Sequence, residues 1–389
     1  KTNCTTMVFE KFCITTRTST SEYTDDLKQY PLYSLTIEDG ITAKTERYER
    51  SHLVKKENSY KVVRPNDYAY NPMNIRFGAV ARHKGDIPVA VSGYYDIFTT
   101  VHESDLVFMD SFLTYGPMIT YYNKVSTGSL VEKQRVHFSD FLEFSLALPP
   151  LEERKKIAEI LSTQDKAIEL QGRKIEELKR FKKGCLEKMF PRKGQKVPEK
   201  RFPGFTDDWE QRKFEEIAVR SSVICSDANL PRVEYEDIVS GAGRLNKDIY
   251  TKESSKSGIA FHQGDVLYGK LRPYLQNWLL PAFDGLAVGD FWVLQPQNAD
   301  SSFLYRLIQS RQFDEVANQS TGTKMPRADW KLVSKTVFSI PSNISEQAAI
   351  GTYFTALDNL ITLHQRKLEE MKNQKKALMQ LLLTGIVRV

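Results

Sequence analysis

The sequence predicts an α+β protein in which two globular modules of mixed helices and strands alternate with two long antiparallel coiled-coil helices. Three observations predict this architecture. The helical pattern of residues 153–183 recurs without a gap 193 residues later. Each copy follows a proline and a globular-looking stretch of similar length, and both copies carry apolar residues at coiled-coil spacing. A chain built in this way has two heads and an internal pseudo-two-fold repeat.

The composition is that of an ordinary soluble protein. The chain has 389 residues, of which 41% are hydrophobic and 27% are charged, enough for two or three domains. It contains no apolar run of the roughly 20 residues that a membrane helix needs, and no signal peptide is visible. The four cysteines form no CxxC pair, so we expect a cytoplasmic protein.

Positive charge is concentrated in one segment. Residues 151–202 carry 16 Lys or Arg against 9 Asp or Glu, a balance of +7, whereas the whole chain carries +6. Such a segment suits a polyanionic partner, and it equally suits a solvated helix face.

The first module, residues 1–148, reads as strands and short helices. Tyr60–Val63 and Val89–Val91 are expected strands, and Pro149-Pro150 closes the module. The first long helix is expected at 149–190, with Glu152 and Glu153 favourable in its first turn. Its apolar seam alternates spacings of three and four and is interrupted by polar residues at Gln164, Gln171 and Lys182. The seam residues are Ile157, Leu161, Ile168, Ile175 and Leu178.

A basic linker is expected at 191–201, and the second module at 202–340. Pro341 announces the second long helix, at 341–389. Its seam has the same register as the first, 193 residues on, with Ile350, Phe354, Leu357, Ile361, Leu368 and Met371.

Two seams of matching register in one chain are expected to pair with each other, because pairing removes both apolar stripes from water. The intervening module favours an antiparallel arrangement, which forms a rod of roughly 60 Å from about 40 residues. The alternative is two separate amphipathic helices, each packed on its own module.

The modules also resemble each other faintly. Asn66 to Tyr70 matches Gly264 to Tyr268 in its Asp and Tyr, and an arginine follows each at a different distance, Arg76 and Arg272. Thr127-Gly128 and Thr321-Gly322 each lie shortly before the proline that begins a helix. The two heads therefore read as one fold carrying two different surfaces.

This order of parts resembles the specificity subunit of type I restriction–modification systems. The residues that carry the resemblance are the helical repeats, the Pro150 to Ile157 start with Glu346-Gln347 in the second copy, Phe202 through Trp209, and Gly264 to Arg272. No counterpart of Phe202 to Glu210 precedes the first module, so we expect its N-terminal edge to be shortened or atypical.

The resemblance implies a role in DNA recognition without chemistry. Each head would be a target recognition domain that reads one half of a bipartite, asymmetric site in double-stranded DNA. The helices would fix the spacing and dock two methyltransferase subunits. Those partners would bind S-adenosylmethionine, and further restriction subunits would bring ATP and Mg for translocation and cleavage, so this chain would need no cofactor.

The residues agree with a chain that lacks catalysis. Asn71-Pro72-Met73-Asn74 lacks the second proline and the aromatic residue of an adenine methylase motif, so a turn is expected there. The segment 240–244 is glycine-rich but matches no phosphate loop, and the six histidines show no metal-ligand spacing. Asp265 with Lys270 is a weak nuclease-like pair.

Affinity for DNA must come from Lys and Arg on phosphates, and specificity from side chains that reach base edges. Thr127 and Thr321, with their glycines, are expected to present backbone N–H groups to phosphate. The candidate DNA-binding residues of the first module are Asn74, Arg76, Arg82, Lys124, Thr127 and Arg135. Those of the second are Arg244, Tyr268, Lys270, Arg272, Thr321, Lys324 and Arg327.

Two other functions compete with this one. A restriction–methylation enzyme with an unrecognised site would bind S-adenosylmethionine by itself. A coiled-coil adaptor whose two heads bind proteins would lack the steep salt dependence that phosphate contacts impose on DNA affinity.

Overall fold

The computed structural model describes residues 14–15, 22–44, 59–100, 103–128, 130, 134–144, 146, 148–250, 255–319 and 325–389. The chain forms two compact units, one of residues 1–170 with 368–389, and the other of residues 171–367. Each unit therefore contains one module, called head 1 (described residues up to 148) or head 2 (residues 202–340), together with parts of both long helices. The unit boundary falls inside the helices and not at the ends of the expected domains.

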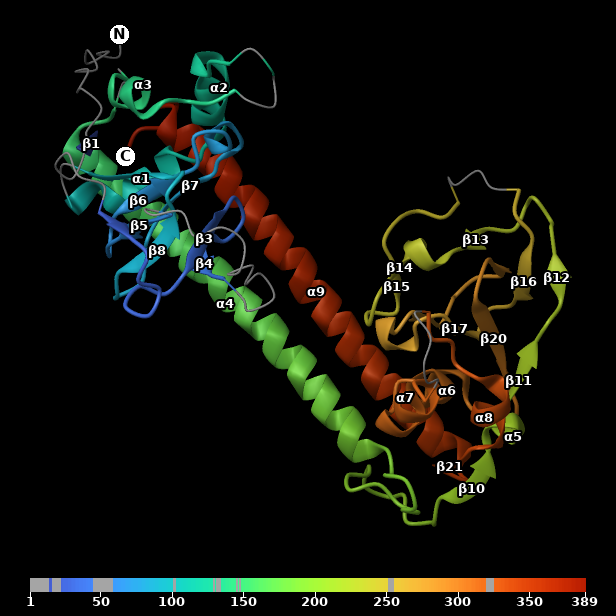
Figure 1. Ribbon diagram of the computed structural model, residues 1–389. Helices are drawn as coiled ribbons and strands as arrows, with labels where there is room; N and C mark the ends of the chain where they lie inside the picture. The colour runs from blue at the N-terminus through green and yellow to red at the C-terminus, as the bar shows by residue number, and fades with distance from the viewer. Residues whose placement is uncertain are drawn as a thin grey trace, which may run out of the picture. The chain divides into compact units, whose positions relative to one another are not determined.

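Head 1 is built on three small antiparallel sheets (Figure 1). Their strand orders are β1-β9-β6-β7, β2-β5-β8 and the hairpin β3-β4. The two strands expected from sequence are present as β5 and β8. The strands are β1 (Ile14–Thr15), β2 (Tyr23–Thr24), β3 (Tyr33–Thr36), β4 (Gly40–Ala43), β5 (Tyr60–Val63), β6 (Tyr68–Tyr70), β7 (Val80–Arg82), β8 (Val89–Ser92) and β9 (Asp96–Thr100).

Short helices and 3-10 turns (labelled η) lie between and after these strands, before the first long helix begins. Phe98, Phe112, Tyr122 and Phe141 are fully buried between helices and sheet, and they form an aromatic core. The helices are η2 (Ile75–Phe77), η3 (Glu103–Asp105), α1 (Leu106–Phe112), α2 (Gly116–Val125), α3 (Phe138–Leu142) and α4 (Leu151–Met189).

Head 2 contains two four-stranded sheets, β11-β20-β17-β18 and β12-β16-β19-β13, and two smaller pairs, β10-β21 and β14-β15. Among the described residues of head 2, every strand pair is antiparallel except β13 with β19. The strands are β10 (Glu210–Lys213), β11 (Ala218–Ser221), β12 (Ile224–Cys225), β13 (Arg232–Val233), β14 (Ile238–Val239), β15 (Arg244–Leu245), β16 (Gly258–Phe261), β17 (Val266–Gly269), β18 (Trp278–Leu279), β19 (Gly285–Ala287), β20 (Phe291–Pro296) and β21 (Val337–Ile340).

Three helices of head 2 start at side-chain caps. Asp300, Ser310 and Asp329 each accept a backbone N–H from the first turn of the helix that follows. The second long helix then packs directly on the head, since a Cβ at Gly351 would lie 1.7 Å from the Ser302 hydroxyl. The helices are α5 (Phe214–Ile217), η5 (Tyr235–Asp237), η6 (Pro273–Leu275), α6 (Ser301–Leu307), α7 (Arg311–Ala317), α8 (Trp330–Lys335) and α9 (Ile344–Leu383).

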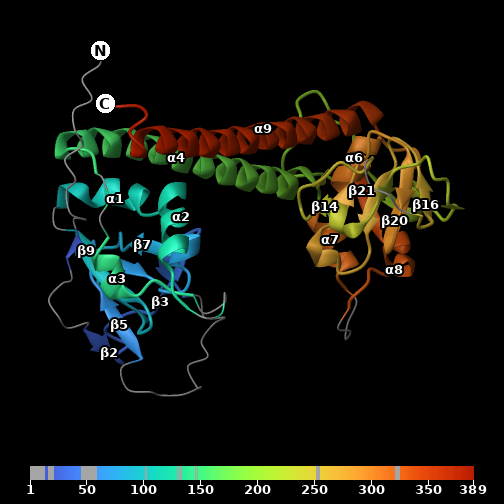
Figure 2. The ribbon, with the colours of Figure 1, turned by 90° about the horizontal axis from the view of Figure 1, so that it is seen from above.

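In each unit the α4 and α9 segments lie side by side and antiparallel (Figure 1, Figure 2). In the first unit, the start of α4 (Ile157, Leu161) shares one apolar core with the end of α9 (Leu382, Leu383) and with head 1. In the second unit, the end of α4 (Met189) shares a core with the start of α9 (Ile350, Phe354) and with head 2. The expected pairing of the two seams is confirmed within each unit, and the helices are packed on the heads as well.

The same two residues of the repeat form an ion pair in each unit. In the first unit, Lys375 of α9 lies 2.5 Å from Asp165 of α4. In the second unit, Lys182 of α4 lies 2.6 Å from Asp358 of α9, which also binds the buried Arg306 of head 2 at 2.7 Å. Asp165 and Asp358 are 193 positions apart, as are Lys182 and Lys375. In an antiparallel two-fold repeat, each contact between the two copies occurs twice with the copies exchanged. The two Asp–Lys pairs are such a duplicated contact.

A polar contact interrupts the seam of the second unit. The amide nitrogen of the buried Gln171 lies 2.9 Å from both the backbone oxygen and the Nδ1 atom of His364. These two residues also occupy the same position of the repeat. A polar pair at a seam position fixes register, because a slipped register would leave the amide without partners.

Each long helix is anchored at its start by a buried polar side chain of the same repeat position. Arg154 donates to the Pro149 carbonyl at 2.8 Å and binds both carboxylate oxygens of Asp105 at 3.0 Å. Gln347 donates to the Pro341 carbonyl at 2.8 Å and accepts the N–H of Asp300 at 2.9 Å. Each helix is therefore linked to its head by buried hydrogen bonds, for which water does not compete.

Two features are absent from the described part of the chain. No described helix is long and apolar enough to cross a membrane. No group of three or more His, Cys, Asp or Glu among the described residues is arranged to hold a metal ion.

Replacing Arg154 by alanine should destabilise the first unit strongly. Arg154 and Asp105 each expose only 1% of their side chains, so the change leaves a buried carboxylate without its partner, at a cost of about 3–5 kcal/mol. Urea denaturation followed by circular dichroism measures this loss. Lys155→Ala is the matched control, because its partner Glu152 is solvent-exposed, and it should leave the unfolding curve unchanged. Equal effects of the two variants would contradict the anchoring role of Arg154.

Candidate nucleic-acid interface

The two heads carry the same turn after the same central strand. In head 1, β6 is followed by η2 and then by its partner strand β7. In head 2, β17 is followed by η6 and then by its partner strand β18. The two segments align without a gap when 198 is added to the head 1 numbers, so η2 (75–77) matches η6 (273–275).

The backbones of the two segments agree at the special positions. Asn66 and Gly264 both have positive φ values, and the Asp that follows each accepts a backbone N–H from three residues before it. At the far end, Gly78 and Gln276 both adopt the left-handed conformation, with φ of 97° and 57°. The N–H group of each donates to the first residue of its 3-10 turn. The faint sequence similarity of the heads is thus a shared strand and turn.

In head 1, the η2 turn contacts two other segments that carry expected DNA-binding residues. Asn123 of α2 donates to the Arg76 carbonyl at 2.8 Å, and Arg76 donates to the Gln134 side chain at 2.8 Å. Thr127 and Arg135 exchange two backbone hydrogen bonds of 3.0 Å. These contacts bring together five of the residues that were expected to bind DNA. Arg76 is buried, at 8% exposure. The exposed ones are Asn74, Lys124, Thr127 and Arg135.

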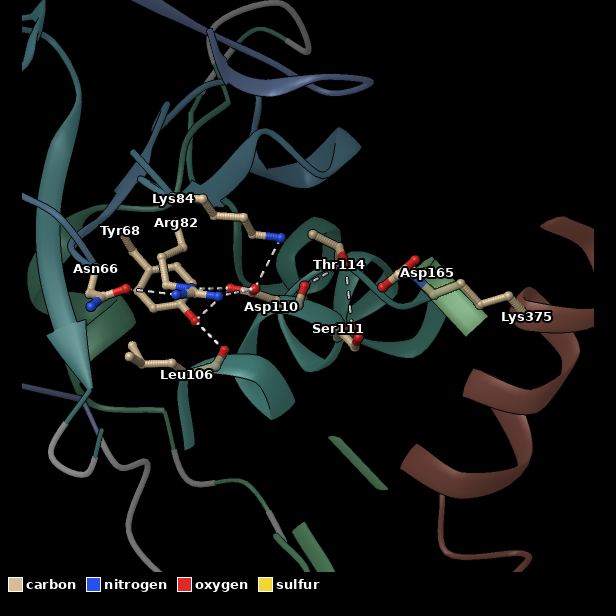
Figure 3. A network of polar contacts seen from close by, with 10 residues as sticks. All are labelled: Asn66, Tyr68, Arg82, Lys84, Leu106, Asp110, Ser111, Thr114, Asp165 and Lys375. Atoms are coloured by element: carbon tan, nitrogen blue, oxygen red, sulfur yellow. Dashed lines mark hydrogen bonds and ion pairs between the residues drawn. The ribbon is translucent and has the colours of Figure 1, made fainter. Parts of the chain in front are cut away.

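Arg82 lies elsewhere, in an internal ion pair (Figure 3). Its guanidinium binds both oxygens of Asp110 at 2.9 and 2.8 Å, while Tyr68 donates to the same carboxylate. Burial lowers the pKa of Arg82, but the hydrogen bond and charge of Asp110 outweigh it and raise the pKa above its usual value. Arg82, which was expected to bind DNA, is thus held by a carboxylate of the fold, and the exposed Lys84 approaches the same carboxylate at 3.2 Å.

In head 2, three of the expected cations lie around one segment. Lys270 and Arg327 both approach the carboxylate of Asp290, at 3.5 and 3.0 Å. Backbone hydrogen bonds from Arg272 to Pro326 and from Ala328 to Lys270 hold the two strips together. Two cations share one carboxylate, so a net positive charge remains at this surface, where Arg327 exposes 56% of its side chain.

The expected glycine-rich turn lies beside η6. It is the loop between β14 and β15, which carries the exposed Arg244. Gly241 donates to the Gln276 carbonyl at 3.0 Å, and the Ser240 hydroxyl donates to the Asn277 side chain at 2.9 Å. The hairpin is thus joined to the end of the shared turn.

Tyr268 does not reach this surface. It exposes 2%, stacks on Trp292 and contacts Phe313 edge to face, and burial raises the pKa of its hydroxyl well above the usual value. It is a core residue, which corrects the expectation that it touches DNA. Thr321 and Lys324 lie outside the described residues.

Two conspicuous residues of the turns escaped the sequence analysis. Phe77 on η2 exposes 52% of its surface, and Tyr274 on η6 exposes 56%. An aromatic residue next to a Pro or an Arg has no distinctive spacing, and the match of Asn66 to Tyr70 with Gly264 to Tyr268 ends before the turn, where the two sequences differ.

The seam residues divide by burial. Ile157, Leu161, Ile175, Ile350, Phe354 and Ile361 are buried, whereas Ile168, Leu178, Leu357, Leu368 and Met371 are half-buried. Burial is not confined to the parts that pack on a head, because Ile175 and Ile361 are buried outside both of the cores that the helices share with the heads.

Comparison with known protein families shows to which of them this chain belongs. The model of the type I restriction modification DNA specificity domain matches residues 112–180 and 207–373, more than half of the chain. The chain belongs to this family.

Curated relatives in the family agree in kind. The type I restriction enzyme MjaVIII specificity subunit of Methanocaldococcus jannaschii is 26% identical over 273 residues, which are 64% of this chain and 63% of the relative. The EcoDI specificity subunit of Escherichia coli is 24% identical over 227 residues, 50% of this chain and 51% of the relative. The chain thus spans less than two thirds of the length of these relatives.

Solved structures of the family share the fold. A chain from a study of complex assembly and conformational transition of the type I R-M system superposes with a TM-score of 0.57 at 14% identity, covering 94% of this chain and 95% of that one. The type I S subunit from M. genitalium superposes with a TM-score of 0.52 at 14% identity, covering 96% and 93%. The expected α+β fold class is thereby confirmed.

Replacing Asp290 by asparagine should strengthen non-specific binding to DNA. The change frees Lys270 and Arg327 from their shared carboxylate, so each can bind a phosphate, and roughly one extra counterion should be released per new contact. Titration of a random duplex at several salt concentrations measures the affinity and its salt slope. Asp284→Asn is the control, because it removes the same charge from head 2 beside His262, away from these cations. Unchanged affinity and slope for Asp290→Asn would contradict a DNA-facing role for this cluster.

Proposed function

We propose that this chain is the DNA-recognition subunit of a cytoplasmic type I restriction–modification complex and carries out no chemistry itself. Each head binds one half of a bipartite, asymmetric site in double-stranded DNA. One observation carries the proposal: the heads hold the same turn next to exposed cations, yet they present different side chains on it. Two heads that share this turn but expose different side chains on it are suited to two different half-sites.

The physical basis of recognition divides between charge and shape. Lys124 and Arg135 of head 1, with Lys270 and Arg327 of head 2, supply phosphate contacts that set affinity without sequence information. The side chains of η2 and η6 then supply contacts with base edges.

The paired helices hold the two heads and dock the partner subunits. Their seam is closed by apolar residues and by the repeated Asp–Lys pairs, so the separation of the half-sites follows from helix length at 1.5 Å per residue. The partners are two methyltransferase subunits, which bind S-adenosylmethionine, and restriction subunits, which use ATP and Mg.

Leu170 and Leu363 are the best candidates for the docking residues. They occupy the same position of the helical repeat, and they expose 57% and 62% of their surfaces. Large apolar side chains that a two-helix pair leaves in water are suited to cover by helices of a partner protein. Duplication of the position suits two identical partners.

Long-read mapping of DNA methylation tests the proposed function. Cells with the partner methyltransferase and this chain should carry a bipartite adenine mark, and the mark should vanish when this chain is deleted. An unchanged methylation pattern would remove the main support for the proposal.

Replacing Leu363 by glutamate should weaken assembly with the methyltransferase subunits by roughly 10-fold or more, since a charge would then have to be buried at the contact. Leu170→Glu should have the same effect at the other copy. Binding of the purified subunits in sedimentation experiments measures it. Leu332→Glu on α8 is the control, because it makes the same change at a residue that is 40% exposed on head 2. If all three variants assemble normally, the docking site is elsewhere.

A further inference from the structure

We propose that the five-residue turn of each head, residues 74–78 and 272–276, is the element that selects bases in its half-site. This inference rests on the proposed function and makes it specific. The surrounding cations bind the DNA backbone, whereas these ten residues decide which sequence is bound.

The two turns share a 3-10 turn and a left-handed last residue, and they carry different side chains. Their first residues differ in backbone, because Asn74 is right-handed (φ −105°) and Arg272 is left-handed (φ 49°). Ile75 and Pro273 occupy the same position, and both are buried and anchor the turn on its head. The other positions pair Asn74 with Arg272, Arg76 with Tyr274, Phe77 with Leu275 and Gly78 with Gln276. The anchor is thus kept and the presented chemistry is changed, as expected of an element that gives two copies of a fold different specificities.

The turns present apolar side chains to water. Phe77 exposes 52%, Tyr274 exposes 56% and Leu275 exposes 37%. Arg76 stacks over the Phe77 ring at 4.7 Å, which holds that ring outward. Exposed aromatic residues near cations are suited to the methyl group of thymine and to unstacked base faces.

The turn of head 2 is held in a costly conformation. Arg272 and Gln276 are both left-handed, with φ of 49° and 57°, although neither is glycine. Contacts from outside the turn maintain this backbone: the Pro326 carbonyl accepts the N–H of Arg272, and the Gln276 carbonyl accepts the N–H of Gly241. Strain that a fold maintains from outside is typical of functional segments.

The side chains indicate which bases each turn prefers. Arg272 is half-buried at the start of its turn, and the equivalent residue Asn74 is exposed. A guanidinium can bridge the O6 and N7 acceptors of guanine, whereas an amide is suited to the N6 and N7 atoms of adenine. We therefore expect a guanine in the half-site of head 2 and an adenine in that of head 1.

The test is a selection from a random pool of duplexes, using the full-length chain in complex with its methyltransferase subunits. The unmodified chain should enrich a bipartite sequence. Arg272→Lys and Tyr274→Ala should each lower base preference in one half-site by about 10-fold and leave the other half unchanged. Asn74→Ala should relax the opposite half. The unaffected half-site reports in each case that the complex is folded.

Tyr250→Ala is the matched control, because Tyr250 is a tyrosine of the same head that exposes 68% and packs against Phe283 instead of the turn. It should leave both half-sites unchanged. Should Tyr274→Ala lose both halves, Tyr274→Phe, which retains the ring, decides whether the ring carries the preference. An unaltered enriched sequence, or a uniform loss of affinity across all sequences, would overturn the assignment to the turn. If the unmodified chain enriches no sequence, the proposed function itself fails.

Discussion

The structure depends on the antiparallel pairing of two copies of one helix. Each copy has an apolar seam that continues along most of its length, so the seam is stable when it is buried against another helix. Pairing the copies with each other buries both seams at once. The repeated Asp165–Lys375 and Asp358–Lys182 contacts, together with Gln171 and His364, then select the antiparallel register.

A duplicated frame allows the two copies to diverge where the fold does not constrain them. The central strand, the Asp-capped turn before it and the left-handed residue after it are the same in both heads, because they determine how the sheet closes. The exposed positions of the η2 and η6 turns are not needed for closure, so they are free to differ. The heads are therefore similar where the residues determine the fold, and they differ where the residues are exposed on the turns.

Much of the architecture could be predicted from the sequence, because helical periodicity and a long ungapped repeat are local signals. The strands β5 and β8 and the turn at residues 71–74 were predictable for the same reason. Individual site residues were harder. Tyr268 alternates with neighbours that are also buried, so its inward direction could not be read from spacing, and Arg82 meets an Asp110 that lies 28 residues away.

The helices repeat at 193 residues and the turns at 198, so an alignment taken from the helices places Asn74 opposite Leu267. The match of Asn66 to Tyr70 with Gly264 to Tyr268 has the 198-residue offset, but it ends before the turn, where the two sequences differ. The strand pairs β6–β7 and β17–β18 carry this offset through the turn and make Asn74 and Arg272 equivalent. The expected DNA-binding role of the individual residues stays a prediction.

Cross-linking of paired cysteines tests the antiparallel pairing most directly. In a chain whose native cysteines are replaced by serine, Asp165→Cys with Lys375→Cys, and Lys182→Cys with Asp358→Cys, should each react with a short bifunctional maleimide and form an internal link. Parallel pairing would instead bring the two equivalent aspartates face to face. Efficient linking of Asp165→Cys with Asp358→Cys, and failure of both Asp–Lys combinations, would contradict the account.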